Sequence, residues 1–197
     1  TQAHKNILFI MESLNGGGAE RVLIEILKNL DYTKYNIALC LVREGGVYHT
    51  DVPPSVFCFK LFAYPILYRY VKKITQVTKT DILLKKIINR KIKEKFDIVI
   101  SFLEGPALKV HSLLNGEHKN ITWVHTNLHS HRWHIKYFGS LEEERKGYAK
   151  MDCIVFVSSS IIKPFDYLFN NISTRKIVFY NPIDRERILK KSKEFIK

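Results

Sequence analysis

Short apolar runs rich in β-branched residues recur along the 197-residue chain, and they constrain its fold more than any other feature. Several are apolar nearly throughout, which is typical of strands that a parallel sheet buries on both faces. Helical patterns lie between most of them, at 18–30, 82–95, 106–114, 141–150 and 160–169. This alternation predicts an α/β protein with a doubly wound, mostly parallel Rossmann-like sheet of about seven strands and helices on both faces. The predicted strands are 6–11, 36–42, 57–62, 97–102, 120–125, 153–157 and 176–180.

Three consecutive glycines, Gly16, Gly17 and Gly18, separate the first predicted strand from the first predicted helix. A strand that leads through a glycine turn into a helix brings free backbone N–H groups and the positive end of a helix dipole to one point. Such a point binds anions, most often phosphate, and Arg21 in the first helical turn would add a positive charge. Taken alone, the glycines are equally consistent with a tight turn that binds nothing.

The glycine stretch matches neither common nucleotide-binding motif. The dinucleotide fingerprint G-x-G-x-x-G requires a third glycine where this chain has Arg21. A Walker A loop requires Gly-Lys-Ser/Thr, which does not follow the glycines. Since Glu44 supplies an acidic residue after the second predicted strand, an NAD-dependent enzyme is disfavoured rather than excluded.

Ligands of a parallel sheet bind beyond the carboxyl ends of its strands. We therefore expect residues 14–21, 103–105, 125–127 and 158–160 to line one crevice. His125 follows the fifth predicted strand, where a histidine can hydrogen-bond a sugar hydroxyl or steady charge near a reacting centre. A solvated loop histidine is the alternative for this residue.

Three more histidines, His129, His131 and His134, follow shortly afterwards. Their spacing fits no HExxH pattern, and no carboxylate lies close to them in the sequence. We therefore predict no metal site and expect these histidines to line a polar loop that faces phosphate or solvent.

The chain carries 32 lysines and arginines against 19 acidic residues, so its surface must attract anions. Ten of these basic residues lie between Arg69 and Lys95, where only two acidic residues occur. An apolar stripe of Leu84, Ile88 and Ile92 predicts one buried face for this basic helix. The basic side chains then form either an ordinary solvated face or, together with the aromatic residues just upstream, a surface for an anionic membrane. The candidate membrane-facing residues are Lys72, Lys73, Lys85, Lys86, Arg90 and Lys93.

Cys40, Cys58 and Cys153 lie far apart in apolar runs and lack metal-ligand spacing, which predicts buried thiols in a reducing compartment. No apolar run is long enough to span a membrane, and no signal-peptide pattern opens the sequence. We therefore expect a cytoplasmic location, with the basic segment able to hold the protein peripherally on the inner face of the membrane.

Four phrases, in their order and spacing, resemble the N-terminal half of a GT-B-fold glycosyltransferase of the retaining family 4: ILFIMESLNGGGAERVLIEIL, ITWVHTNLH, CIVFVSSSI and KIVFYNPID. The resemblance covers about residues 6–184. It implies that residues 1–181 form an N-terminal, acceptor-side Rossmann-like domain and that 182–197 begin an interdomain linker. It further implies a C-terminal nucleotide-sugar-binding domain, with its pair of glutamates eight residues apart, beyond this chain.

The resemblance also assigns roles to individual residues. It places His125 at the sugar-transfer centre as the catalytic residue, and it brings Gly16, Gly17, Gly18 and Arg21 close to the donor diphosphate. Residues that follow other strands into the same crevice are candidates for acceptor binding: Glu104, Asn127 and Ser158. The implied co-substrate is a nucleotide-sugar, with no permanently bound cofactor and no metal.

The expected function is hexosyl transfer from a nucleotide-sugar to a glycan or lipid-linked acceptor, with retention, in the synthesis of cell-surface polysaccharide. Because half of the crevice would be missing, we expect the isolated chain to be inactive.

Two alternatives stay open. An NAD- or nucleotide-dependent Rossmann enzyme would bind its dinucleotide tightly within this chain. A non-enzymatic basic module would bind a membrane or nucleic acid with steep salt dependence, although no RNP, KH or zinc-finger pattern supports nucleic acid.

Overall fold

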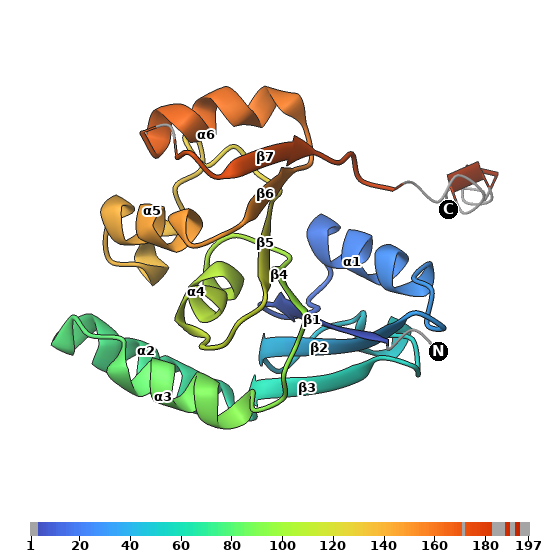
Figure 1. The fold of residues 1–197 in the computed structure, drawn as a ribbon, viewed down its shortest axis with the longest axis horizontal. Coiled ribbons are helices and arrows are strands. Elements are labelled where there is room, and N and C mark those ends of the chain that lie inside the picture. Colours follow the sequence, from blue (N-terminus) through green and yellow to red (C-terminus); the bar gives the residue numbers. More distant parts are fainter. Residues whose placement is uncertain (1–3, 171, 183–187, 190–191, 194–197) are drawn as a thin grey trace.

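The computed structural model describes residues 4–170, 172–182, 188–189 and 192–193, and in these residues the strands form one seven-stranded sheet of order β3-β2-β1-β4-β5-β6-β7 (Figure 1). Every neighbouring pair is parallel. The predicted α/β sheet is thus confirmed, and it is parallel throughout rather than mostly so. The strands are β1 (Lys5–Met11), β2 (Tyr35–Arg43), β3 (Phe57–Phe62), β4 (Ile98–Ser101), β5 (Lys119–Val124), β6 (Cys153–Phe156) and β7 (Arg175–Val178).

The helices connect consecutive strands, as the alternating sequence pattern predicts. They are α1 (Gly18–Lys28), α2 (Pro65–Thr78), α3 (Ile82–Lys91), α4 (Pro106–Leu113), α5 (Leu141–Ala149) and α6 (Ile162–Leu168). Three short 3-10 turns accompany them: η1 (His49–Asp51), η2 (Ile135–Tyr137) and η3 (Ser159–Ile161). Helix α2 is not among the predicted helices, although Pro65 stands at its first turn, where proline favours helix initiation.

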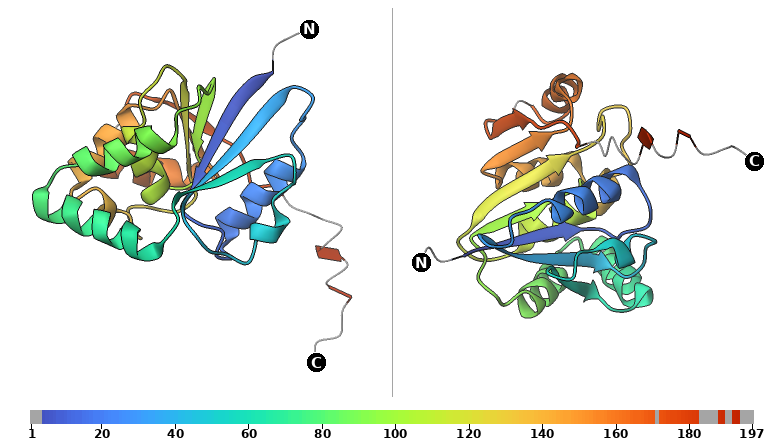
Figure 2. Two further views of the ribbon diagram at one scale, coloured as in Figure 1. Left: turned by 90° about the horizontal axis from the view of Figure 1, so that it is seen from below. Right: turned by 90° about the vertical axis from the view of Figure 1, so that its right-hand side faces the viewer.

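The two faces of the sheet are covered by different helices (Figure 2). Leu8 and Ile10 of β1 point to the face that packs against α2, α3 and α4. Phe9 and Met11 point to the other face, which packs against α1. A third cluster joins α4, α5 and α6 to β5 and β6. This alternation of side chains along β1 explains why its sequence is apolar nearly throughout.

The strand order reverses between β1 and β4, and this reversal positions the candidate site. Open α/β sheets bind ligands at such a switch point, beyond the carboxyl ends of the strands. Here β1 leads into the glycine turn, defined as residues 14–18, and β4 leads into Leu103, Glu104 and Gly105.

Of the predicted linker 182–197, residues 183–187, 190–191 and 194–197 lie outside the described residues. Within the described ranges, no helix has both the length and the apolar character needed to cross a membrane.

The thiol of Cys40 is buried, and burial raises its pKa to about 12, whereas Cys58 and Cys153 are half-buried.

Candidate active site

The glycine turn is held by the backbone of the loop that follows β2. The Leu14 N–H donates to the Gly45 carbonyl at 3.1 Å, and the Tyr48 N–H donates to the Leu14 carbonyl at 3.2 Å. Gly46 packs so closely on Leu14 that a Cβ there would overlap the Leu14 carbonyl. By contrast, a Cβ at Gly18 would meet nothing within 4 Å. The side of α1 at Gly18 is therefore open, so the backbone there can be approached closely.

Two charged side chains, Glu20 and Arg21, lie in the first turn of α1, directly after the glycine turn. Arg21 pairs with Glu25 at 2.6 Å and with Asp51 at 3.4 Å, and its guanidinium lies 5.6 Å from the centre of the Tyr48 ring. The Glu20 carboxylate folds back over Gly17, where a Cβ would overlap it. A phosphate at the turn would take the place of the Glu20 carboxylate at the positive end of α1.

Glu104, directly after β4, is fully buried and ties β4 to the end of β5. Its Oε2 accepts the His125 N–H at 3.1 Å, while its Oε1 accepts the Thr126 N–H at 3.1 Å and the Thr126 hydroxyl at 2.5 Å. Burial raises the pKa of this carboxyl, and the Thr126 hydroxyl opposes the rise. Both oxygens hold the backbone beside His125, so Glu104 positions the candidate catalytic residue in this structure.

His125 follows β5, and its ring lies 5.0 Å from that of Phe102 between their centres. Its Nε2 is buried and has no hydrogen-bond partner among the described residues. Burial lowers the pKa of the imidazole to about 4, so the ring is neutral near pH 7. A buried nitrogen without a partner is costly in a folded protein unless a ligand group completes it. Such a nitrogen can hydrogen-bond a ligand hydroxyl once the side chains that cover it move aside.

The other two candidates for acceptor binding shape their own loops. The Oδ1 atom of Asn127 accepts the N–H groups of His129 and Ser130, each at 3.2 Å. The Ser158 Oγ accepts the Ser160 N–H at 3.2 Å. The structure thus joins Glu104 directly to His125, whereas Asn127 and Ser158 make local contacts. A role of these two residues in acceptor binding stays a prediction.

The three later histidines lie in different environments, since His129 is half-buried, His131 is exposed and His134 is buried. His134 is fully buried, and its Nδ1 lies 2.6 Å from the Glu144 Oε2 of α5. The expectation of a polar or solvated position is wrong for His134, because Glu144, ten residues later in the chain, returns to pair with it. The Glu144 carboxylate raises the pKa of the imidazole. In the part of the chain that the structure describes, no group of three or more His, Cys, Asp or Glu residues is arranged to hold a metal ion.

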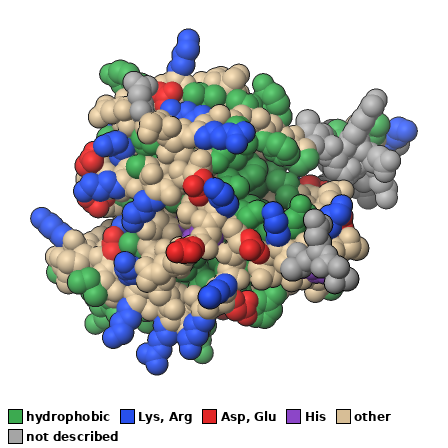
Figure 3. All heavy atoms as spheres, viewed as in Figure 1, with side chains coloured by type: hydrophobic (Ala, Val, Ile, Leu, Met, Phe, Trp, Pro, Cys, Tyr) green, Lys and Arg blue, Asp and Glu red, His purple; other side chains and the backbone are tan. Residues whose placement is uncertain are grey.

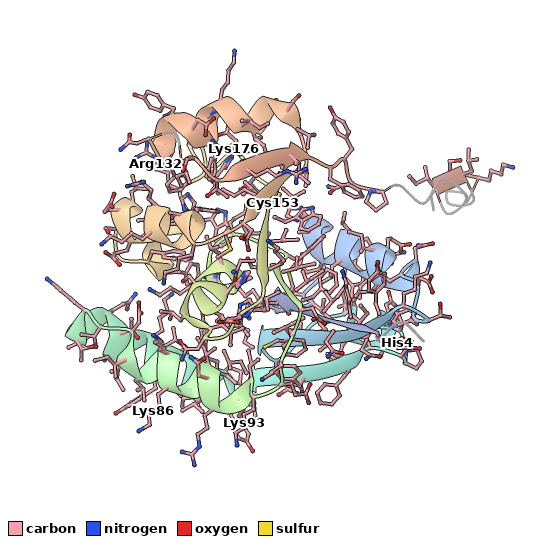
Figure 4. All side chains as sticks on the ribbon, in the orientation of Figure 1. His4, Lys86, Lys93, Arg132, Cys153 and Lys176 are labelled. Atoms are coloured by element: carbon pink, nitrogen blue, oxygen red, sulfur yellow. The ribbon has the colours of Figure 1, made fainter. Side chains whose placement is uncertain are left out.

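The candidate membrane-facing residues divide into two groups. Lys73, Lys85, Lys86, Arg90 and Lys93 are exposed on α2 and α3 or just beyond, and basic side chains line this edge of the molecule (Figure 3). Lys86 and Lys93 project away from the rest of the protein (Figure 4). Lys72 differs, because its Nζ lies 4.3 Å from the centre of the Tyr137 ring and it lines a cavity.

That cavity, of about 570 Å³, lies between α2, the start of α4 and residues 135–140. Sequence analysis missed it because its longest wall, α2, was not predicted. The spacing of Tyr68, Val71 and Thr75 along one face of a helix that begins at Pro65 is the signal that could have revealed this wall.

Comparisons with known proteins bear on the fold. No protein-family model matches the sequence, and no curated protein matches it either. Among solved structures, the chain is similar to Anabaena Alr3699/HepE in a crystal structure in complex with UDP and glucose, with 18% sequence identity and a TM-score of 0.56. The match covers 92% of this chain and 45% of that one. The match supports the Rossmann-like α/β fold described above. The chain spans rather less than half of the length of HepE.

Proposed function

We propose that this chain is the N-terminal, acceptor-side part of a retaining GT-B glycosyltransferase of the family 4 type, which transfers a hexose from a nucleotide-sugar to a glycan or lipid-linked acceptor. The observation that carries the proposal is the match of 92% of the chain to a protein whose crystal structure contains UDP and glucose. UDP and glucose are the two parts of a nucleotide-sugar donor. The match spans 45% of that chain, and we propose that a further domain of the full-length protein binds most of the nucleotide.

The site supplies chemistry that fits this proposal. In sugar transfer the bond from the anomeric carbon to the diphosphate breaks, and negative charge grows on the diphosphate. The N–H groups at the start of α1, with Arg21 nearby, would stabilise that charge. The unpartnered Nε2 of His125 would bond a hydroxyl of the transferred sugar, and Glu104 would fix the histidine backbone. The proposed chemistry needs no metal at this site.

We further propose that α2 and α3 hold the protein on the cytoplasmic face of an anionic membrane, where cell-surface polysaccharide is assembled. Exposed apolar side chains accompany the basic ones there, namely Ile66, Tyr70, Val77 and Ile82. Apolar side chains set among lysines are typical of interfacial helices. Sedimentation with vesicles tests this contact: we expect binding only with anionic lipid, and weaker binding of Lys85→Gln/Lys86→Gln. Equal binding to neutral vesicles would contradict it.

Activity of the natural full-length protein tests the function. Purified protein is incubated with UDP-, GDP- and ADP-hexoses and with lipid extract as the acceptor source, and release of nucleoside diphosphate is measured. We expect one nucleotide-sugar to be consumed only when the acceptor is present, and the 197-residue chain alone to release none. Turnover by the isolated chain, or tight binding of NAD to it, would favour a Rossmann enzyme complete in this chain.

A further inference from the structure

The cavity under α2 has a floor of apolar side chains and a charged lining in which four lysines outnumber Asp81 and Glu143. Val71, Leu84 and Val110 belong to the core on this face of the sheet and line its interior. Its volume of about 570 Å³ is within the range of small-molecule sites in proteins, which is roughly 300–1,000 Å³. An apolar interior with charged groups at the mouth suits an amphipathic ligand rather than a simple ion.

Two lysines of the cavity lining, Lys72 and Lys136, approach the same aromatic ring. The Nζ atoms of Lys72 and Lys136 lie 4.3 and 5.2 Å from the centre of the same ring, that of Tyr137. No carboxylate of the described residues forms an ion pair with either lysine, whereas Lys109 of the same cavity pairs with Asp81. Burial and the charge of Lys136 both lower the pKa of Lys72, and the Glu12 carboxylate opposes this shift. Like charges held together in this way are stabilised when an anion binds between them.

Thr75 adds a hydrogen-bonding group to the same wall. Its Oγ1 is buried and has no hydrogen-bond partner within residues 4–170 and the other described ranges. Thr75 lies one helical turn from Lys72 on α2, so the hydroxyl and the ammonium occupy the same side of the helix. A phosphate oxygen would satisfy both groups.

The cavity adjoins the candidate active site through the segment that follows β4. A Cβ at Gly105 would lie 2.8 Å from the Trp133 Cζ3 and 3.4 Å from the Tyr137 Cδ2, so both rings pack on this glycine. Glu104, the preceding residue, holds the His125 backbone. One short segment therefore separates His125 from the Tyr137 side of the cavity.

We propose that this cavity binds a phosphate or diphosphate ester of an apolar alcohol, with the phosphate between Lys72 and Lys136 and the apolar chain on the floor. The identification of this ligand as the sugar acceptor rests on the proposed function, but the binding itself does not. Two sources supply such chemistry: a single-chain lipid carrier and a membrane phospholipid.

Isothermal titration calorimetry with the 197-residue chain tests the proposal, with geranyl diphosphate as the probe and with geraniol and inorganic pyrophosphate for comparison. We expect geranyl diphosphate to bind at least about tenfold more tightly than either, because only it engages both the floor and the lysines. Equal binding of pyrophosphate would overturn the apolar part of the proposal, and equal binding of geraniol would overturn the anionic part. Dihexanoyl-phosphatidylglycerol distinguishes the sources: tighter binding of this lipid indicates a phospholipid, and weaker binding a single-chain carrier.

Matched charge variants locate the site. Lys72→Gln/Lys136→Gln should weaken geranyl diphosphate binding by about tenfold or more, and Lys28→Gln/Lys163→Gln, with the same loss of charge at exposed positions of α1 and α6, by less than about twofold. Thr75→Val removes the hydroxyl with little change in volume and should weaken binding about threefold or more. Thermal melts confirm that each variant is folded. Equal weakening by the two double variants would show that the probe is attracted only by the general positive charge of the protein. It would overturn the proposal that the cavity is the binding site. Lys72-dependent binding in a full-length protein that transfers no sugar would uphold the cavity and overturn the proposed function.

Discussion

The glycine turn and the β5 loop, residues 125–140, stand at the same edge of the sheet but are shaped in opposite ways. The glycine turn is held by the loop that follows β2, because Gly46 of that loop has no side chain and packs directly on the Leu14 backbone. The β5 loop owes its form to two buried carboxylates, Glu104 at its start and Glu144 behind His134. One region is thus held by close backbone packing and the other by buried carboxylates. Substitutions and changes of pH should therefore affect the stability of the two regions differently.

Loss of the Glu104 carboxylate should have the largest effect. Glu104→Ala leaves two backbone N–H groups and the Thr126 hydroxyl without their buried acceptor, at about 1–3 kcal/mol for each group. We expect the free energy of unfolding in urea to fall by about 3–5 kcal/mol. Glu142→Ala on the exposed side of α5 is the control and should change it by less than about 0.5 kcal/mol. Equal effects of the two variants would show that Glu104 does not hold the loop.

Acid should weaken the β5 loop region through His125. Its folded pKa of about 4 lies below the unfolded value of about 6.5, so the unfolded chain binds more protons between these pH values. Stability should therefore fall as the pH drops from 6.5 to 4, by up to about 3 kcal/mol from this residue. His125→Asn should flatten that part of the profile, and His131→Asn in the exposed part of the loop should not. An unchanged profile in His125→Asn would contradict the burial of the imidazole.

A methyl group should damage the packing of the glycine turn. In Gly46→Ala the new Cβ meets the Leu14 carbonyl at a φ of +133°, and we expect a loss of about 2–3 kcal/mol. Gly18→Ala is the matched change, because its Cβ meets nothing and helix propensity favours alanine by up to about 1 kcal/mol. Chemical denaturation of both variants measures the contrast. If Gly46→Ala were as stable as Gly18→Ala, the close packing of the two loops would be disproved.

We expect the smallest change in stability from the N-cap of the helix that follows each region, α1 after the glycine turn and α5 after the β5 loop. Ser140 caps α5, and its side chain accepts the Glu143 N–H at 3.2 Å, whereas Gly17 at the N-cap of α1 makes no side-chain hydrogen bond among the described residues. Ser140→Ala should cost about 1 kcal/mol in urea denaturation, and Ser140→Thr should restore most of it. No change in Ser140→Ala would mean that packing alone starts α5.

The same contrast explains what could be predicted from the sequence. The strands and the glycine turn are local patterns, because alternate side chains of β1 reach both faces and glycines mark a turn directly. The Glu104 contacts join residues 21 and 22 positions apart, and Glu144 returns to His134 only after the loop has folded. No periodicity signals such pairs. The aromatic residues around Tyr68 were interpreted as a stretch upstream of the basic helix. Helix α2 was therefore not predicted, and neither was the cavity that it covers.

Sugar transfer by His125 variants of the full-length protein tests the central claim most directly. We expect His125→Ala to lower kcat by about 100-fold or more, and His131→Ala, which removes an imidazole from the same loop, to keep kcat within about twofold. Circular dichroism confirms that both variants are folded. If His125→Ala kept wild-type turnover, His125 would have no place at the transfer centre, and the candidate active site at this edge of the sheet would be contradicted.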